Sequence, residues 1–411
     1  MTRRFPEELI PEDFPLGEEA LAKCAARFGT PLYIYDGSVA KSRVAALNEM
    51  LPDGTNISYS LKANPATELV ELFSSLGCGV EVSSRGEFEV VKRLGLTGER
   101  TLWVGPGKSD EELLAAVSGN CIVVAESSRE VERIGAAANL CGAKARVALR
   151  INPGIRSGAL SMAGITQFGM GFDEALHLLR GPRDNPLEIC GVHGFLGTRL
   201  LDADKLADNL SIVLDISARL QSESGRRFDF VDVGGGFGVP LYEGEALLDG
   251  KKLRGVLAGR FRRYKDIHPW TRAVAVESGR FLSSEAGVLL VKVVEVKAVH
   301  GARFAIVDGG LNVIGGRDGY LGRKLTPMKI LSSKGRDEGR YTICGPRCTP
   351  TDRLAVDVTM PEVFEGDIVA IYQAGAYGAT ASPGRFLGRG YARELYHLEG
   401  AFKEVFAGGM I

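Results

Sequence analysis

The sequence predicts an α/β protein with an additional β-domain: a (β/α)8 barrel followed by a mostly antiparallel β-domain. Its 411 residues exceed the size at which a single core usually stops growing, so two domains are expected. From residue 31 to 280 short β-rich runs alternate with amphipathic stretches, and after residue 279 the runs follow one another without long helices. Repeated strand and helix units indicate parallel pairing. Eight units are typical of a closed barrel, although counting alone also admits an open doubly wound sheet.

Eight β-rich runs are the expected barrel strands. They are residues 57–63, 79–84, 101–105, 121–126, 146–152, 191–197, 228–235 and 273–279. Between them apolar residues recur at threes and fours, the helix period, in segments 66–77, 86–94, 110–117 and 203–220. The glycine-rich stretch 153–190 breaks this period and is interpreted as a loop-rich insertion after the fifth strand.

The C-terminal part is expected to be a β-domain. Its runs are residues 288–299, 303–308, 354–359, 367–373 and 392–398, and apolar and polar residues alternate in parts of them. The first thirty or so residues are expected to pack on this domain. The predicted bounds are therefore 31–280 for the barrel, and 1–30 together with 281–411 for the β-domain.

Composition limits the possible partners. Fifty Lys and Arg balance 51 Asp and Glu, and there is no basic tail, so neither nucleic acid nor an anionic membrane is an expected partner. No run of 18 apolar residues occurs, and a soluble cytoplasmic protein is expected. Seven cysteines are scattered without a CxxC pair, so neither a metal site nor a disulfide framework is expected.

Lys62 is the expected chemical centre, because it follows an extended apolar run and precedes Pro65. A lysine at the end of a buried strand loses solvation, which favours the neutral amine, and a neutral amine condenses with an aldehyde to a Schiff base. This is the reaction by which pyridoxal 5′-phosphate attaches to its enzymes. The alternative is a strand-end lysine that reaches into solvent.

Two motifs at later strand ends suit the rest of such a cofactor. Gly234, Gly235 and Gly236 follow the seventh run, where glycines let backbone N–H groups approach a phosphate; the alternative is a tight turn. Glu277 ends the eighth run and precedes Arg280. A carboxylate would keep a pyridine nitrogen protonated and an arginine would bind phosphate, whereas the alternative is an internal Glu–Arg ion pair.

Together these residues resemble the fold type III pyridoxal phosphate decarboxylases, the group of diaminopimelate, ornithine and arginine decarboxylases. The resemblance spans nearly the whole chain, and its motifs occur in the family's order. They are Lys62 as the Schiff-base lysine, Arg150, the loop 167–170, Gly234–Gly236 as phosphate-binding glycines, Glu277 as partner of the pyridine nitrogen, Gly279 and Arg280 as further phosphate contacts, Asp308, Cys348 and Tyr377.

The resemblance implies a barrel and β-domain like those of alanine racemase and ornithine decarboxylase. It also implies a head-to-tail homodimer with shared active sites, in which Cys348 enters the partner's site and returns a proton after carbon dioxide leaves. Lys62, Glu277 and Cys348 are then the expected catalytic residues. Tyr377 is expected to contact cofactor and substrate, and Asp308 to contact substrate.

Two departures from the family pattern concern the substrate. Relatives with basic substrates stack a histidine on the cofactor ring, and here Phe195 takes that position. His193, two residues earlier on the same strand, is a candidate to replace that histidine in part and to contact the cofactor, but a satisfied strand histidine is the favoured interpretation. Relatives place an acid directly after the cysteine to read a distal ammonium, and here that residue is Thr349. Asp352, three residues further, is the remaining candidate for that role.

The lost acid predicts a substrate with a neutral or acylated distal end. The Cys348-Thr349-Pro350 motif and the segment 373–383 are also similar to a subgroup found beside acyl ligases and carrier proteins, which acts on amino acids tethered through a thioester. The basic stretch 260–265 either docks an acidic carrier or is a solvated helix face. Alternative functions are a free diaminopimelate, ornithine or lysine decarboxylase, a racemase-like enzyme, or a catalytically silent homologue that binds partners.

Overall fold

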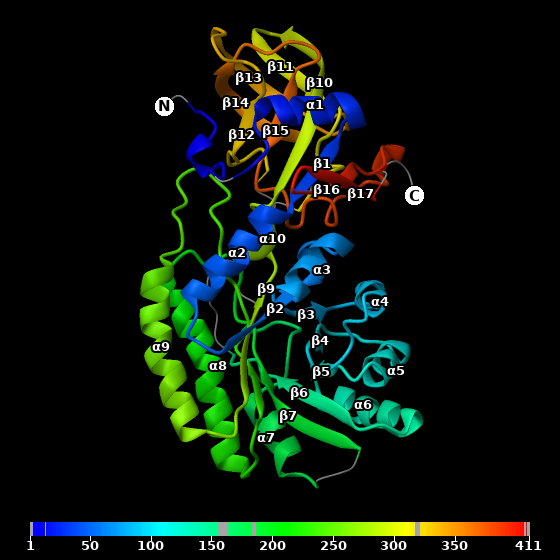
Figure 1. Cartoon of the computed structure of the whole chain (residues 1–411), viewed down its shortest axis with the longest axis vertical. Helices are drawn as coiled ribbons and strands as arrows, with labels where there is room; N and C mark the ends of the chain where they lie inside the picture. The colour runs from blue at the N-terminus through cyan, green and yellow to red at the C-terminus, as the bar shows by residue number, and fades with distance from the viewer. Residues whose placement is uncertain are drawn as a thin grey trace. The chain divides into compact units, whose positions relative to one another are not determined.

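The computed structural model describes residues 3–12, 14–154, 163–182, 186–316, 321–406 and 408. The chain forms two compact units (Figure 1). The barrel unit comprises residues 44–239 and 247–279, and the β-unit comprises residues 1–43, 240–246 and 280–411.

The barrel unit contains a closed parallel barrel of eight strands, as predicted, and this excludes the open doubly wound sheet. The strands are β2 (Thr55–Ser60), β3 (Gly79–Val82), β4 (Thr101–Trp103), β5 (Ile122–Ala125), β6 (Ala145–Arg150), β7 (Leu187–His193), β8 (Phe230–Asp232) and β9 (Ala273–Ser278). Each overlaps one predicted run, and β2 pairs with β9 to close the barrel. Apolar side chains fill a layer inside it, among them Leu102, Ile122 and Phe230.

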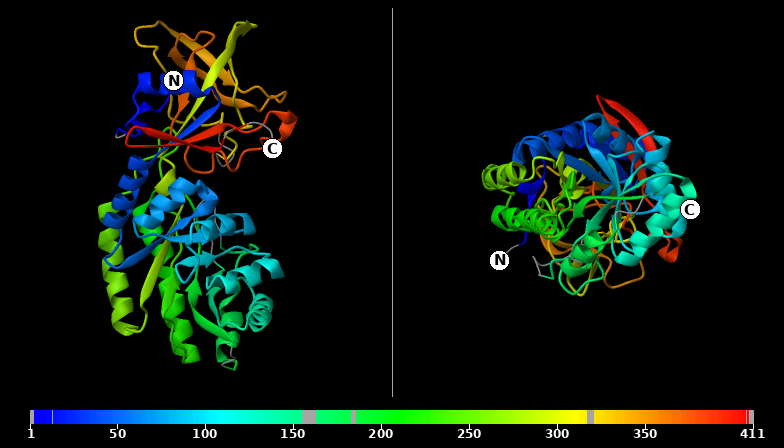
Figure 2. Two further views of the ribbon diagram at one scale, coloured as in Figure 1. Left: turned by 45° about the vertical axis from the view of Figure 1, so that its right-hand side comes forward. Right: turned by 90° about the horizontal axis from the view of Figure 1, so that it is seen from below.

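Helices surround this barrel on its outside, as the right-hand view of Figure 2 shows. They are α3 (Thr67–Ser75), α4 (Arg85–Arg93), α5 (Asp110–Ser118), α6 (Ser128–Cys141), α7 (Phe172–Arg180), α8 (Ala203–Ser224) and α9 (Gly250–Ile267). Three of them begin directly after a serine cap: the hydroxyls of Ser84, Ser109 and Ser127 each accept a backbone N–H of the first turn. These caps end the strand-to-helix loops sharply, which leaves the carboxyl ends of the strands for functional residues.

The β-unit is built on one mixed, mostly antiparallel sheet of nine strands. They are β1 (Leu32–Asp36), β10 (Gly287–Val299), β11 (Ala302–Val307), β12 (Met328–Ile330), β13 (Glu338–Cys344), β14 (Arg353–Pro361), β15 (Ile368–Ile371), β16 (Arg393–Leu398) and β17 (Ala401–Phe406). The remaining elements of the β-unit are η1 (Glu7–Leu9), α1 (Glu18–Phe28), α10 (Arg280–Ser283) and η3 (Phe386–Gly388). The turn η2 (Leu61–Ala63) belongs to the barrel unit, and the boundary between the units falls within α2 (Gly37–Met50).

Strand β1 lies in this sheet, although the predicted bounds placed it in the barrel. It pairs with β10 on one side and β16 on the other, and all five of its residues are buried. A strand buried on both faces has no alternation that tells which sheet it joins. The predicted insertion 153–190 lies partly outside the described residues; its described part contains α7 and the first residues of β7.

None of the described helices combines the length and the hydropathy needed to cross a lipid bilayer.

Candidate active site

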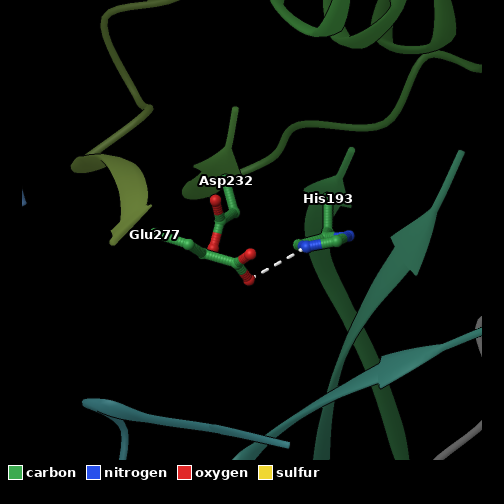
Figure 3. Close-up of side chains that lie close together, drawn as sticks. All are labelled: His193, Asp232 and Glu277. Carbon is green, nitrogen blue, oxygen red and sulfur yellow. Dashed lines mark hydrogen bonds and ion pairs between the residues drawn. The ribbon is translucent and has the colours of Figure 1, made fainter. Parts of the chain in front are cut away.

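Polar side chains gather at the carboxyl ends of the barrel strands, where barrel enzymes carry their chemistry. Lys62 follows β2 in the turn η2, His193 ends β7, Asp232 ends β8 and Glu277 lies in β9. Figure 3 shows His193, Asp232 and Glu277 side by side. One ring nitrogen of His193 and one carboxylate oxygen from each of Asp232 and Glu277 all lie within 4.8 Å of one another.

The Lys62 amine is paired with a buried carboxylate. Its Nζ lies 2.5 Å from Oε1 of Glu81, whose other oxygen accepts the Ser60 hydroxyl. Burial and then the neighbouring Glu277 raise the pKa of Glu81. The sequence predicts an amine in a desolvated strand end, but the Lys62 side chain is 39% exposed. The reason is that the lysine lies in the turn beyond the strand, where it reaches both Glu81 and the open end of the barrel.

Glu277 is held by His193. Its side chain is 2% exposed, and its Oε1 lies 3.0 Å from Nε2 of His193. Burial alone would raise the pKa of Glu277, but the neighbouring His193, Lys62 and Arg150 outweigh burial and lower it. Glu277 is therefore suited to remain an anion in the barrel interior. His193, expected to contact cofactor, is here a hydrogen-bond partner of Glu277.

The glycine loop after β8 packs without room for side chains. A Cβ at Gly235 would lie 2.0 Å from the Glu277 carbonyl oxygen, and one at Gly236 would lie 2.4 Å from the Gly197 carbonyl oxygen. Gly234 and Gly236 also have φ of +77° and +100°, values that favour glycine. A backbone loop of this kind can approach a phosphate closely, so these residues fit the phosphate end of pyridoxal phosphate.

Phe195 lies next to both the glycine loop and the lysine. The Lys62 Nζ lies 5.8 Å from the centroid of the Phe195 ring. A Cβ at Gly235 would lie 3.4 Å from the edge of the same ring. An aromatic face is thus available near the lysine.

A second buried network holds Arg150. Its Nη1 donates to Oε1 of Glu126 at 2.7 Å, and the backbone N–H of Gly169 donates to Oε2 of the same carboxylate at 2.7 Å. The Arg150 guanidinium also lies 4.6 Å from the Phe168 ring. Glu126 was not singled out from the sequence; the available signal was an acid at the end of the fourth predicted run.

Other predicted site residues lie in the β-unit. The Arg280 guanidinium lies 4.6 Å from the Tyr377 ring. Asp308 accepts the Thr30 hydroxyl and the backbone N–H of Lys292, so both of its oxygens are engaged. Cys348 is exposed.

Asp352 fixes the turn that carries Cys348. The carboxylate accepts the backbone N–H of Leu311 at 2.7 Å on one oxygen and that of Arg347 at 2.8 Å on the other. The residue is 2% exposed. A Cβ at Gly310 or Gly345 would come within 2.4 Å of these oxygens, so both glycines are needed for the carboxylate to fit. Asp352 is thereby committed to backbone groups.

Comparisons with known proteins agree with this arrangement. Residues 38–284 match the family model described as "pyridoxal-dependent decarboxylase, pyridoxal binding domain". The chain is 32% identical to the L-glutamyl-[BtrI acyl-carrier protein] decarboxylase of Niallia circulans, over 95% of this chain and 94% of the relative. It is 30% identical to the diaminopimelate decarboxylase of Aquifex aeolicus, over 88% and 86%. The crystal structure of Helicobacter pylori diaminopimelate decarboxylase complexed with L-lysine superposes with a TM-score of 0.85 at 27% identity, over 95% and 96%.

Proposed function

We propose, from the premise that this chain belongs to the pyridoxal-dependent decarboxylases, that it decarboxylates an amino acid whose distal end is neutral or acylated, such as one tethered to a carrier protein. When bound, pyridoxal phosphate supplies the electron sink that accepts the electron pair left by carbon dioxide. The remaining tasks fall to residues of the chain: holding the cofactor, keeping a proton on its ring nitrogen, and returning a proton to carbon.

The barrel cluster supports the cofactor assignment. Lys62 would form the covalent link, and its pairing with Glu81 holds the amine at the barrel mouth. Glu277, kept anionic by His193, would hold the proton on the ring nitrogen. The loop of Gly234–Gly236, with Gly279 and Arg280, would bind the phosphate, while Phe195 offers its face to the ring.

Proton return is proposed to need a second chain. Cys348 is exposed on its turn, and a thiol is a competent general acid toward carbon. We assign this step to Cys348 of the partner subunit, in a homodimer with shared active sites.

The observation that carries the substrate proposal is that no free carboxylate is found among the described residues of the Cys348 turn. Thr349 follows the cysteine, at the position where an acid would bind a distal ammonium. The nearest acid in the turn is Asp352, and both of its carboxylate oxygens accept backbone N–H groups. A distal ammonium brought there would lose its water without gaining a carboxylate, which costs several kcal/mol. A neutral or acylated end avoids this cost. The Niallia circulans relative is named for a glutamyl group carried by an acyl-carrier protein.

The test is carbon dioxide release from matched substrates. Purified protein with pyridoxal phosphate is given glutamate tethered to an acyl-carrier protein, free glutamate, diaminopimelate, ornithine and lysine. We expect the tethered amino acid to have the highest kcat/KM. Efficient turnover of free ornithine would contradict the interpretation of Thr349.

Free diaminopimelate is the second candidate, because it is the substrate named for the Aquifex aeolicus relative. The same panel separates the two. A preference for diaminopimelate over the tethered amino acid would show that an acid outside the Cys348 turn reads its distal end.

A further inference from the structure

Asp232 lies in a buried cluster of three acidic side chains, and the basic side chains around them each pair with another acid. Its residue is 0% exposed, and it shares the barrel interior with Glu81 and Glu277. The basic side chains that face the cluster are Lys62, which pairs with Glu81, His193, which pairs with Glu277, and Arg150, which pairs with Glu126. None of these pairs includes Asp232.

The two carboxylate oxygens of Asp232 differ in their hydrogen bonds. Oδ1 accepts the backbone N–H of Gly234 at 2.8 Å. Oδ2 is buried and has no hydrogen-bond partner among the described residues. An ionised carboxylate in a dry interior needs donors on both oxygens, and leaving one bare costs more than holding a proton there. By contrast, both oxygens of Glu81 accept hydrogen bonds.

We propose that Asp232 is a neutral carboxylic acid in the folded protein, a positioning residue that anchors the glycine loop through Gly234 without adding a negative charge to it. In this state Oδ1 still accepts the Gly234 N–H, so the start of the loop stays fixed. The charge near the loop remains with Glu277. A neutral anchor matters because an ionised one would repel the phosphate that the loop is proposed to bind.

The electrostatic surroundings agree with this protonation state. Burial, followed by the negative charges of Glu277 and Glu81, raises the pKa of Asp232 well above its ordinary value. The Gly234 N–H and the Lys62 charge act in the opposite direction and are outweighed.

Infrared spectroscopy tests the proton directly, whether or not the protein is active. At neutral pH the full-length protein should show a carbonyl stretch of a protonated carboxylic acid that disappears in Asp232→Asn. A difference spectrum without this band would overturn the proposal. Asp232→Ala, which needs no hydrogen-bond partner at this position, gives the same comparison by an independent variant.

The pH dependence of stability is the second test. An unfolded chain releases an aspartate proton above a pH of about 4, whereas the folded chain would keep the Asp232 proton, so wild-type stability decreases as pH rises through this range. The amide of Asp232→Asn has no proton to retain. The urea midpoint of the variant relative to wild type should therefore increase from about pH 4 to about pH 8. A constant or decreasing difference would contradict a neutral Asp232.

Asp202→Asn is the matched control. Its carboxylate is exposed, caps α8 and accepts the N–H groups of Lys205 and Asp204, which lower its pKa. A lowered carboxyl pKa contributes stability that is gained below the unfolded pKa of about 4 and stays constant above it, so the midpoint of this variant relative to wild type should change little between about pH 4 and about pH 8. Equal trends in both variants would show that the assay does not report on the protonation of Asp232.

Cofactor binding separates the anchoring role from a merely structural one, and this measurement alone rests on the proposed function. Titration with pyridoxal phosphate, followed by absorbance, should show at least about tenfold tighter binding by Asp232→Asn than by Asp232→Ala, because only the amide keeps the acceptor for Gly234. Equal weakening in both variants would show that the negative charge, not the acceptor, is needed. If no variant and no wild type binds the cofactor, the proposed function fails while the infrared and urea results still decide the protonation.

Discussion

At the scale of single residues, the proposed site assigns the chemistry and the choice of substrate to different residues. Lys62, Glu277 and the glycines of the loop follow the family pattern, and they were predicted from sequence because each belongs to a short local motif. Glu81, His193 and Asp232 acquire their roles only through contacts between strands, so their pairings could not be read from the sequence. The exposure of Lys62 was misjudged because the end of a strand and the turn beyond it look alike in sequence.

The first prediction at this scale concerns Lys62. Lys62→Ala removes the amine that would hold pyridoxal phosphate covalently, and we expect turnover to fall by at least about a thousandfold. Borohydride reduction followed by peptide mass analysis should place the cofactor on the peptide containing Lys62 in wild type only. Full turnover in the variant would exclude the proposed covalent link.

A second prediction concerns Thr349. Thr349→Asp restores an acid directly after Cys348, and we expect the ratio of kcat/KM for free diaminopimelate over the tethered amino acid to rise by about tenfold, or about 1.4 kcal/mol. Thr351→Asp, an exposed change in the same turn, is the control and should leave the ratio near that of wild type. A ratio that responds equally to both substitutions would point to a general charge effect.

At the scale of elements, periodicity predicted the barrel well and the sheet less completely. The eight barrel strands are short and bounded by turns, so their runs stand out. Strand β13 was missed because its first three residues, Glu338-Gly339-Arg340, are not buried and look like a loop. Strand β1 was assigned to the wrong unit because its neighbours in the sheet lie more than 250 residues away in the chain.

A prediction at this scale concerns Glu126, which joins the end of β5 to the end of β6 and the loop after it. Glu126→Ala leaves the Arg150 guanidinium buried without its carboxylate, and breaking a buried pair in this way costs about 3 kcal/mol. Urea unfolding should show this loss, and cofactor affinity should fall with it. Glu126→Gln, which keeps an acceptor oxygen, should lose less.

Glu132→Ala is the control for this measurement. Glu132 is exposed on α6, one turn or more beyond the network, and its removal should change the free energy of unfolding by less than about 0.5 kcal/mol. If Glu126→Ala were as mild as Glu132→Ala, the hydrogen bonds of Glu126 would not stabilise the strand ends.

At the scale of the whole molecule, the proposed site residues belong to different units. Lys62 and Glu277 lie in the barrel unit, whereas Cys348 and Tyr377 lie in the β-unit. If Cys348 acts in the partner's site, one intact site can be assembled from two inactive chains. Mixing Lys62→Ala protein with Cys348→Ala protein should then restore activity to about a quarter of wild type, since half of the dimers are mixed and each has one complete site.

The readout is carbon dioxide release after subunit exchange, with each variant alone as the baseline. Sedimentation of the mixture shows whether dimers form. Dimers that exchange subunits without regaining activity would place Cys348 in the site of its own chain, and full activity of Cys348→Ala alone would place it outside any site.

The way Asp352 holds its turn has a consequence for evolution. Among the described residues the carboxylate accepts the main-chain N–H groups of Leu311 and Arg347, so this anchor of the turn does not depend on the side chains at positions 349 and 351. Mutations at these positions can therefore change what the turn recognises while its backbone keeps Cys348 in place. A lineage can move between substrates here by single substitutions, whereas the glycine loop, where even one Cβ would collide with a neighbouring carbonyl, permits almost no variation.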